Sequence, residues 1–421
     1  MTVPAAESYA RAMKIWMKYL IGALLGAALA LVIPLEDSGL RNALGFLFDL
    51  SIRIGRYALV PLVLFSVPVA VFEQNEDREF WKGLGRTLLV LIAAVAVLSL
   101  VGVIIAAAVR PSRIPLVADA ASAAKAPSLK DLLLAVFPES PFAALASGQF
   151  LLPTYFLALL LGLAFSHDRA ATKPVVLLFD SLSRVFYQIN SFFAEFLGVL
   201  IIATTAHNVL ELRTAARADV YQPLLLTVGI EALVVTLVVL PAALWFFGGR
   251  KNPYRVLYAL LAPSLAALVS GDLYFPLGSL MKHAKESLGI RRRANAIDIP
   301  LAAIFGRAGT ALVTSTTFIV VLSSYSNLGV SFGNLLWIIV FAPLATLMVG
   351  SSPDRGAMAA LMSLCALYGK GFENGFLIAS PVALPLIAIG AFLDALWAGC
   401  ASLLLARRSD LALEKESRFF I

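Results

Sequence analysis

The residues best suited to chemistry in this chain are two charged side chains inside very apolar helices. Arg307 and Asp394 each lie in a stretch long enough to cross a membrane. A short polar break precedes each stretch, at 270–272 and at 350–356. Charges at membrane depth pair with one another or mark the path of a solute or ion. Paired, interrupted apolar segments are also the best sequence indicator of a transporter's binding site. The sequence therefore predicts transport of a solute.

The composition and the placement of charge predict a protein embedded in a lipid bilayer. The chain has 421 residues, of which 60% are hydrophobic and only 14% charged, whereas soluble domains have about 25% charged residues. The net charge of +7 comes from basic clusters beside apolar segments, such as 291–293 and 407–408, and does not indicate nucleic-acid binding. Basic residues flank spans on the cytoplasmic side. We therefore expect a multi-pass cell-membrane protein with both termini and the 282–293 loop in the cytoplasm.

The apolar stretches predict an all-α polytopic membrane protein with eight transmembrane helices and two re-entrant helical hairpins. The hairpins are expected at 256–281 and 332–368, around the two polar breaks. If one hairpin enters from each membrane face, the two halves are inverted repeats and the hairpin tips meet. The eight expected spans are 19–34, 43–72, 87–109, 150–166, 174–206, 221–248, 295–323 and 377–406.

The residues of catalytic and metal sites are scarce in this chain. It has two cysteines and three histidines, and none has the spacing of a zinc site. A nucleophile paired with a base is not recognisable at membrane depth. We therefore expect no enzyme activity, no cofactor and no bound metal.

Several segments resemble the dicarboxylate/amino acid:cation symporter family, which includes the glutamate and neutral amino acid transporters. Residues 141–165 look like the family's fourth helix, and 44–68 is similar to its second helix. Gly309-Thr310-Ala311-Leu312 matches the end of the unwound motif in the seventh helix. Asp394 stands where the last helix of the family carries the aspartate that binds a substrate amino group.

This resemblance implies a glutamate-transporter-like homotrimer that moves a small-molecule solute by an elevator mechanism. It implies a fixed scaffold made of 1–86 and 130–219. Residues 87–129, with the third span and an extracytoplasmic loop, would join 220–410 in a mobile transport domain. Residues 411–421 would be a cytoplasmic tail.

The departures from the family pattern concern its sodium and substrate ligands. Gly306-Arg307-Ala308 replaces the Asn-Met-Asp that supplies sodium ligands, and Trp397 replaces the substrate-binding arginine. Further oxygen-bearing side chains of the family's last helix become Ala398, Ala401 and Leu405. Because sodium needs hard oxygen ligands, these changes argue against sodium coupling.

Arg307 has three interpretations, all of which the sequence leaves open. It is a tethered cation in place of sodium, a partner for an acidic group of the solute, or the structural partner of Asp394 or Asp272. Arginine stays protonated in proteins, so each interpretation gives it an anionic or hydrogen-bonding partner.

The remaining candidates have alternative roles too. Asp394 is expected to bind an ammonium group. Together with Asp272 and Trp397, it favours a larger, less acidic or partly aromatic solute with an amine over aspartate or glutamate. Asp272 either contacts the solute or caps the second helix of its hairpin, and Trp397 either forms a pocket wall or only packs. Glu231, inside the sixth span, either carries a proton or pairs structurally. The candidate substrate-binding residues are Ser270, Asp272, Arg307, Thr310, Ser351, Ser352, Asp354, Arg355, Asp394 and Trp397.

We therefore expect a secondary-active transporter of an amino-acid-like or carboxylate-like solute, independent of sodium and preferably coupled to protons. The alternatives are an uncoupled facilitator, a substrate-binding receptor on the same fold, and an ordinary sodium:dicarboxylate or amino acid symporter. The sequence leaves open the identity of the solute, the coupling ion and the direction of net transport.

Overall fold

The computed structural model is helical throughout the residues that it describes, apart from connecting turns and one isolated β-bridge. Seven of its helical segments are long and apolar enough to cross a membrane: 15–32, 38–76, 80–109, 169–214, 222–247, 292–325 and 375–408. This confirms the predicted all-α polytopic class. The described residues are 13–34, 37–76, 80–114, 126–146, 151–214, 218–325, 330–351 and 356–421.

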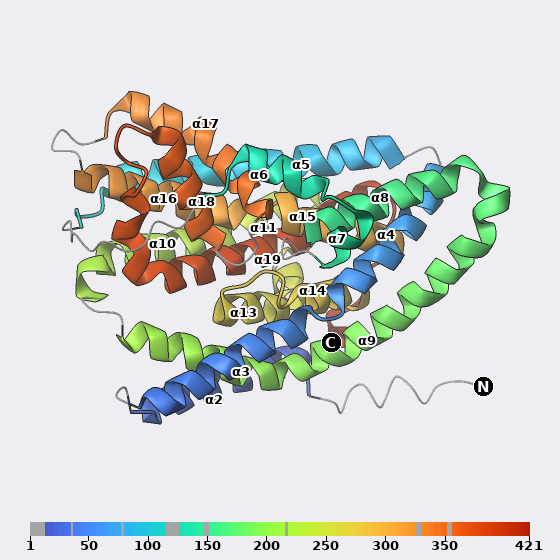
Figure 1. Cartoon of the computed structure of the whole chain (residues 1–421), viewed down its shortest axis with the longest axis horizontal. Coiled ribbons are helices and arrows are strands. Elements are labelled where there is room, and N and C mark those ends of the chain that lie inside the picture. The colour runs from blue at the N-terminus through green and yellow to red at the C-terminus, as the bar shows by residue number, and fades with distance from the viewer. Residues whose placement is uncertain are drawn as a thin grey trace.

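One side of the molecule is formed by helices from the first half of the chain (Figure 1, lower part). Here α2 (Ile15–Val32) and α3 (Ser38–Arg56) pack along α9 (Arg169–Thr214). Small residues bring α2 and α9 close together: a β-carbon at Gly22 would lie only 2.2 Å from the carbonyl oxygen of Gly198. Close backbone approach through small residues is the usual way in which helices associate in a bilayer.

The second expected span, 43–72, is divided into two helices in the structure. Helix α3 ends at Arg56, and α4 (Leu59–Glu76) begins after two intervening residues. Pro61 lies in the first turn of α4, where a residue without an N–H donor is tolerated. In the interior of one continuous helix the same proline would remove a hydrogen bond, so it favours a break before α4. Helix α4 packs against α8 (Leu151–His167), which has 17 residues and corresponds to the expected fourth span. The expected total of eight spans stays a prediction.

The second half of the chain is built around one nearly completely buried helical segment. Helices α15 (Arg292–Phe305) and α16 (Ala308–Tyr325) form this segment. In its most apolar stretch of 18 residues, 94% is buried, whereas the corresponding stretches of the other six spanning segments are 28–61% buried. This segment therefore forms the core. The surrounding elements are α5 (Phe80–Val109), α10 (Gln222–Val234), η2 (Val235–Val239), α11 (Leu240–Phe247), α17 (Phe332–Met348), α18 (Gly356–Tyr368), η5 (Gly375–Val382) and α19 (Ala383–Arg408).

Both expected hairpins are present as pairs of short helices. The first consists of α12 (Tyr254–Ala259) and α13 (Leu261–Ser270), a tip, and α14 (Leu277–Glu286). It lies between the first-half helices and the buried core (Figure 1, yellow). The second consists of α17, the short η3 (Val349–Ser351) and α18. The short helices α6 (Leu129–Val136) and α7 (Pro141–Ala146) precede α8.

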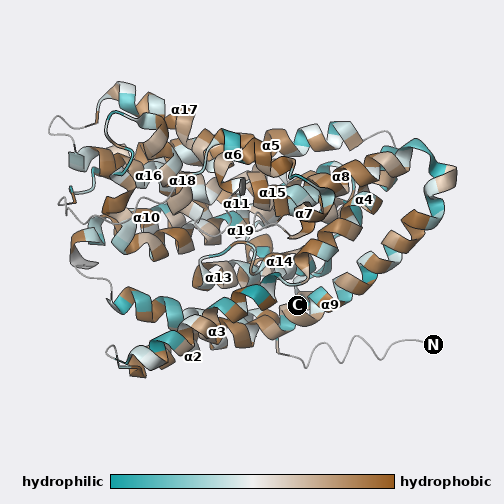
Figure 2. Ribbon diagram, viewed as in Figure 1, coloured by the Kyte–Doolittle hydropathy of each residue, from teal (hydrophilic) through white to brown (hydrophobic). Residues whose placement is uncertain are grey.

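Large apolar side chains are exposed along the long helices. Examples are Leu24 on α2, Leu89 on α5 and Leu233 on α10, each more than 60% exposed. In Figure 2, brown hydrophobic stretches run along much of the ribbon of the long helices. A helix that is apolar on its outer face suits a lipid environment, in agreement with the predicted bilayer location.

Candidate substrate site

The site is organised by the break between α15 and α16. Gly306 and Arg307 lie between the two helices, and the first N–H groups of α16 have no partner within their own helix. Asp394 of α19 satisfies one of them: its Oδ1 accepts from the Thr310 backbone N–H at 3.0 Å, and its Oδ2 accepts from Thr310 Oγ1 at 2.6 Å. Asp394 therefore caps a neighbouring helix, and its negative charge faces the positive end of the α16 dipole.

Glycine makes this contact between α16 and α19 possible. A β-carbon at Gly309 would lie 2.3 Å from Leu393 Cβ and 2.9 Å from the Asp394 nitrogen. These distances are much shorter than ordinary van der Waals contacts. The predicted motif residues 309–312 therefore position Asp394 through close helix packing.

Arg307 is buried beside this cap but pairs with no described acidic residue. Its Nε donates to the Ala303 carbonyl at 3.1 Å, and its guanidinium lies 5.2 Å from the centre of the Tyr274 ring. Its Nη2 is buried without a hydrogen-bond partner among the described residues. An ion pair with Asp272 or Asp394, one of the three interpretations, is not formed within the described part of the chain. The contacts leave one donor of Arg307 for another ligand.

The first hairpin tip is held by Asp272. Its side chain accepts from the backbone N–H groups of Tyr274 and Phe275, each at 3.0 Å, and forms an ion pair with Arg56 of α3 at 2.8 Å. Asp272 thus caps the turn before α14 rather than α14 itself, which begins at Leu277. Ser270 Oγ donates to the Ala266 carbonyl at 2.7 Å and accepts from the Asp272 N–H at 3.2 Å.

The two hairpin tips converge on the side chain of Ile387. A β-carbon at Gly271 would lie 3.5 Å from Ile387 Cγ2, and one at Gly356 would lie 3.3 Å from the same atom. Ile387 precedes Asp394 on α19 by about two turns. Ser352, Asp354 and Arg355 lie outside the described residues, as does the side chain of Ser351.

Two other candidates, Trp397 and Glu231, take no part in the hydrogen bonds between Asp394 and Thr310. Trp397 is buried on α19 and lines a groove between α5 and α11. Glu231 of α10 is completely buried, and both of its carboxyl oxygens lie within 2.9 Å of Thr316 Oγ1. That hydroxyl is also 3.3 Å from the Gly102 carbonyl. No ion pair of Glu231 occurs among the described residues, which argues against the interpretation of Glu231 as one half of a structural pair.

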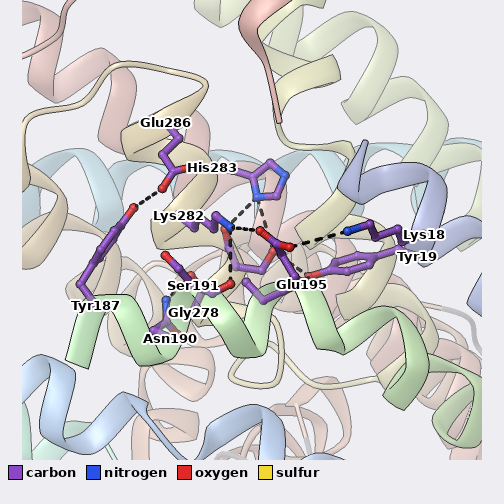
Figure 3. Close-up of polar contacts among 12 residues, drawn as sticks. Lys18, Tyr19, Tyr187, Asn190, Ser191, Glu195, Gly278, Lys282, His283 and Glu286 are labelled. Carbon is purple, nitrogen blue, oxygen red and sulfur yellow. Dashed lines mark hydrogen bonds and ion pairs between the residues drawn. The ribbon is translucent and has the colours of Figure 1, made fainter. Parts of the chain in front are cut away.

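A series of polar contacts joins α9 to the first hairpin and to α15. Figure 3 shows its central part, in which Lys282 of α14 pairs with Glu195 at 3.0 Å and Asn190 donates to the Gly278 carbonyl at 2.8 Å. Tyr19 of α2 donates to Ser279 at 3.0 Å in the same region. The further contacts are Asp180 with Arg292, Tyr187 with Glu286 and Asn208 with the Val269 carbonyl.

The residues that join α9 to the first hairpin and to α15 were not predicted from the sequence, although their spacing indicates a polar face. At about 100° per residue, the polar positions of α9 at 180, 187, 190, 195 and 208 fall on one side of the helix. The many apolar residues of α9 made this polar face difficult to recognise in the sequence. Asp298 of α15 was also missed: it is buried and accepts from Thr87 Oγ1 at 2.9 Å.

This fold, with two hairpins meeting at a broken central helix, is that of a polytopic secondary transporter. The chain belongs to the sodium:dicarboxylate symporter family, whose model matches residues 15–401. The predicted family is thereby confirmed. The protein is a secondary-active transporter of the amino acid and dicarboxylate class, and not an enzyme.

Individual relatives are similar to this chain at low identity. The serine/threonine transporter SstT of Enterococcus faecalis is 26% identical over 386 residues, which cover 90% of this chain and 86% of the relative. The protein of the same name from Acinetobacter baylyi is 24% identical over 392 residues, 90% of each chain. The human neutral amino acid transporter A is 22% identical over 233 residues, 54% of this chain and 42% of the relative.

Proposed function

We propose that this protein carries a small amino acid across the cell membrane by an elevator movement that does not require sodium. The observation that carries the proposal is the convergence of both hairpin tips on Ile387, beside the broken α15–α16 segment and the Asp394 cap. Hairpin tips that meet over a broken helix enclose a small space in which polar backbone groups remain available. The names of the two SstT relatives support a small amino acid as the solute.

In this proposal, the two ends of a zwitterionic solute bind to two different side chains. A carboxylate has about four acceptor positions, so Asp394 can accept from a solute ammonium while it still caps Thr310. Arg307 supplies Nη2, which is buried and unpartnered among the described residues, to the solute carboxylate. In this proposal Ser270 and Asp272 close the site from the first hairpin, and Ser351, Ser352, Asp354 and Arg355 stay candidate substrate-binding residues from the sequence.

The proposed coupling ion is a proton carried by Glu231. Thr316 Oγ has one hydrogen, and both the Glu231 carboxyl and the Gly102 carbonyl are within its reach. When Glu231 is ionised, the hydroxyl donates to it. When Glu231 is protonated, Glu231 donates to the hydroxyl, which then donates to Gly102. The same three groups therefore provide hydrogen bonds for both the ionised and the protonated form of Glu231 without large movement.

The proposed movement separates the polar contacts along α9. These contacts join the proposed scaffold, 1–86 and 130–219, to the proposed transport domain, 87–129 and 220–410. Because α14 belongs to the proposed transport domain and α9 to the proposed scaffold, the Lys282–Glu195 pair would break when one moves along the other. A homotrimer and cytoplasmic termini complete the proposal, on the basis of the family resemblance and the basic clusters.

The test is uptake of labelled serine into proteoliposomes. We expect equal uptake in sodium and in choline, and faster uptake when the outside is more acidic than the inside. Glu231→Gln should remove the effect of the proton gradient, whereas Asp298→Asn, a second buried carboxyl of the core, should retain it. A strict sodium requirement would contradict the proposal and indicate an ordinary symporter. Serine counterflow with no response to either gradient would indicate a facilitator, and binding without flux a receptor.

A further inference from the structure

A large groove opens between α5 and α11, and Asp394 is not among the residues that line it. Its volume is about 1260 Å³, and α19 forms its floor. Pockets for drug-sized ligands have about 300–1,000 Å³, so this groove accommodates a larger molecule. Residues 412–416 and Phe420 of the C-terminal segment form one end of it.

The walls of the groove are apolar. Helix α5 contributes residues such as Leu89 and Val97, and α11 contributes Phe246 and Phe247. Each of these four side chains is more than half exposed. Such walls favour hydrocarbon over a zwitterionic amino acid, because burying polar groups without hydrogen bonds is unfavourable.

The mouth of the groove carries an excess of positive charge. Five basic and two acidic side chains line it: Lys251, Arg255, Arg407, Arg408, Lys415, Glu414 and Glu416. Glu414 pairs with Lys251, and Glu416 pairs with Arg418, which lies outside the lining. Arg255, Arg407, Arg408 and Lys415 therefore form no ion pair within the described residues.

The C-terminal segment fixes this basic mouth in place. Ala412 forms a β-bridge with Ile290, and the Leu413 N–H donates to the Gly289 carbonyl at 2.9 Å. Arg255 donates to the Lys415 carbonyl at 2.9 Å. The basic groups are thus held at the end of an apolar groove and are not scattered on a loose tail.

We propose that this groove binds one anionic phospholipid, with its acyl chains between α5 and α11 and its phosphate at Arg255, Arg407 and Arg408. Two observations carry the proposal: the apolar walls and the unneutralised basic mouth. Basic pockets between helices on the cytoplasmic side are typical sites for anionic headgroups, and arginine binds phosphate in bidentate geometry. Trp397 lines the groove and lies about one turn from Asp394. The lipid would therefore contact the helix that carries the solute site.

The experiment measures lipid binding to the full-length protein in detergent by native mass spectrometry. The probes are phosphatidylglycerol and phosphatidylcholine with identical acyl chains. The Arg255→Gln/Arg408→Gln double variant should bind phosphatidylglycerol about 25-fold more weakly, since each basic group near an anionic lipid contributes roughly fivefold. The matched control is Lys82→Gln/Arg250→Gln, which removes two exposed basic groups outside the groove lining.

The proposal requires that the wild-type protein prefers phosphatidylglycerol and that only the groove variant loses this preference. Equal binding of the two lipids, or the same loss in the control variant, would overturn it. Ala94→Trp/Ala243→Trp fills the groove from both walls and should reduce binding of phosphatidylglycerol without a change in charge. If that variant does not fold, the charge variants still decide the outcome.

Discussion

The Lys282–Glu195 pair offers the sharpest test of the proposed movement. It joins α14 to α9, so Lys282 and Glu195 would separate from each other if the first hairpin moved along the proposed scaffold. Glu195→Gln keeps the size of the side chain but removes its charge. We expect it to reduce the occupancy of the described state relative to the states in which the interface is open.

The magnitude follows from the exposure of the two partners. The Lys282 side chain is 6% exposed, whereas Glu195 is 56% exposed. Removal of one partner costs about 3–5 kcal/mol for a fully buried pair, and exposed pairs contribute about 0.2–1 kcal/mol. For this half-exposed pair we expect about 1–2 kcal/mol, which corresponds to a factor of 5–30 in a population ratio.

The assay is the labelling rate of a cysteine at position 279. Ser279 is buried under Tyr19 at the same interface, with a hydrogen bond of 3.0 Å between their hydroxyls. In a Ser279→Cys background, a maleimide reacts only when the interface opens. Glu195→Gln should accelerate labelling about 5–30-fold. The native thiols, Cys365 and Cys400, are buried and give a low background.

The matched control is Glu211→Gln on the same helix. Glu211 pairs with Arg41 of α3 at 3.6 Å, and this pair lies within the proposed scaffold. Its removal should leave labelling of Ser279→Cys unchanged. An unchanged rate in Glu195→Gln, or equal acceleration in both variants, would refute the reasoning.

Three further substitutions test the site and its packing. Gly309→Ala places a β-carbon 2.3 Å from Leu393 Cβ and should destabilise the protein by about 1–3 kcal/mol. The control is Gly229→Ala, where no atom lies within 4 Å of the added β-carbon; it should leave the midpoint of thermal unfolding unchanged or raise it. Asp394→Asn keeps an acceptor for the Thr310 cap and should lower stability by only about 1 kcal/mol. It should, however, abolish the rise in unfolding temperature (the thermal shift) that serine produces. A normal shift would exclude Asp394 as the ammonium ligand. Arg307→Lys preserves the charge and Arg307→Ala removes it. Loss of the serine-induced shift in both variants would indicate that the solute needs the Nη2 donor of the guanidinium, whereas retention in Arg307→Lys alone would indicate a tethered cation.

Much of the architecture was predictable because hydropathy and breaker residues are local properties. The two hairpins appear where polar breaks interrupt apolar runs, at 270–272 and 350–356. Arg307 and Asp394 stood out because a charge in an apolar stretch needs a compensating partner. The split of the second span at Tyr57 was less evident, since only Pro61 marks it.

The partners of the charged residues were not predictable in the same way. Asp272 was considered as a partner of Arg307, but it pairs with Arg56, which is 216 residues away in the sequence. Asp394 was expected to bind a solute, which stays a prediction, and the structure shows it as the cap of α16. Both outcomes depend on which helix ends lie side by side, and no local pattern encodes that.

The sequence by itself determined that this chain spans a membrane and that two hairpins interrupt it, and it predicted a few buried charges as the candidate site. These conclusions follow from the unfavourable transfer of polar groups into hydrocarbon, which acts on each segment separately. Only the tertiary structure decided that α9 presents a polar face to the first hairpin and that α5, α11 and α19 enclose a groove with a basic mouth. Both features consist of residues from segments far apart in the sequence, and their proximity results from the packing of whole helices.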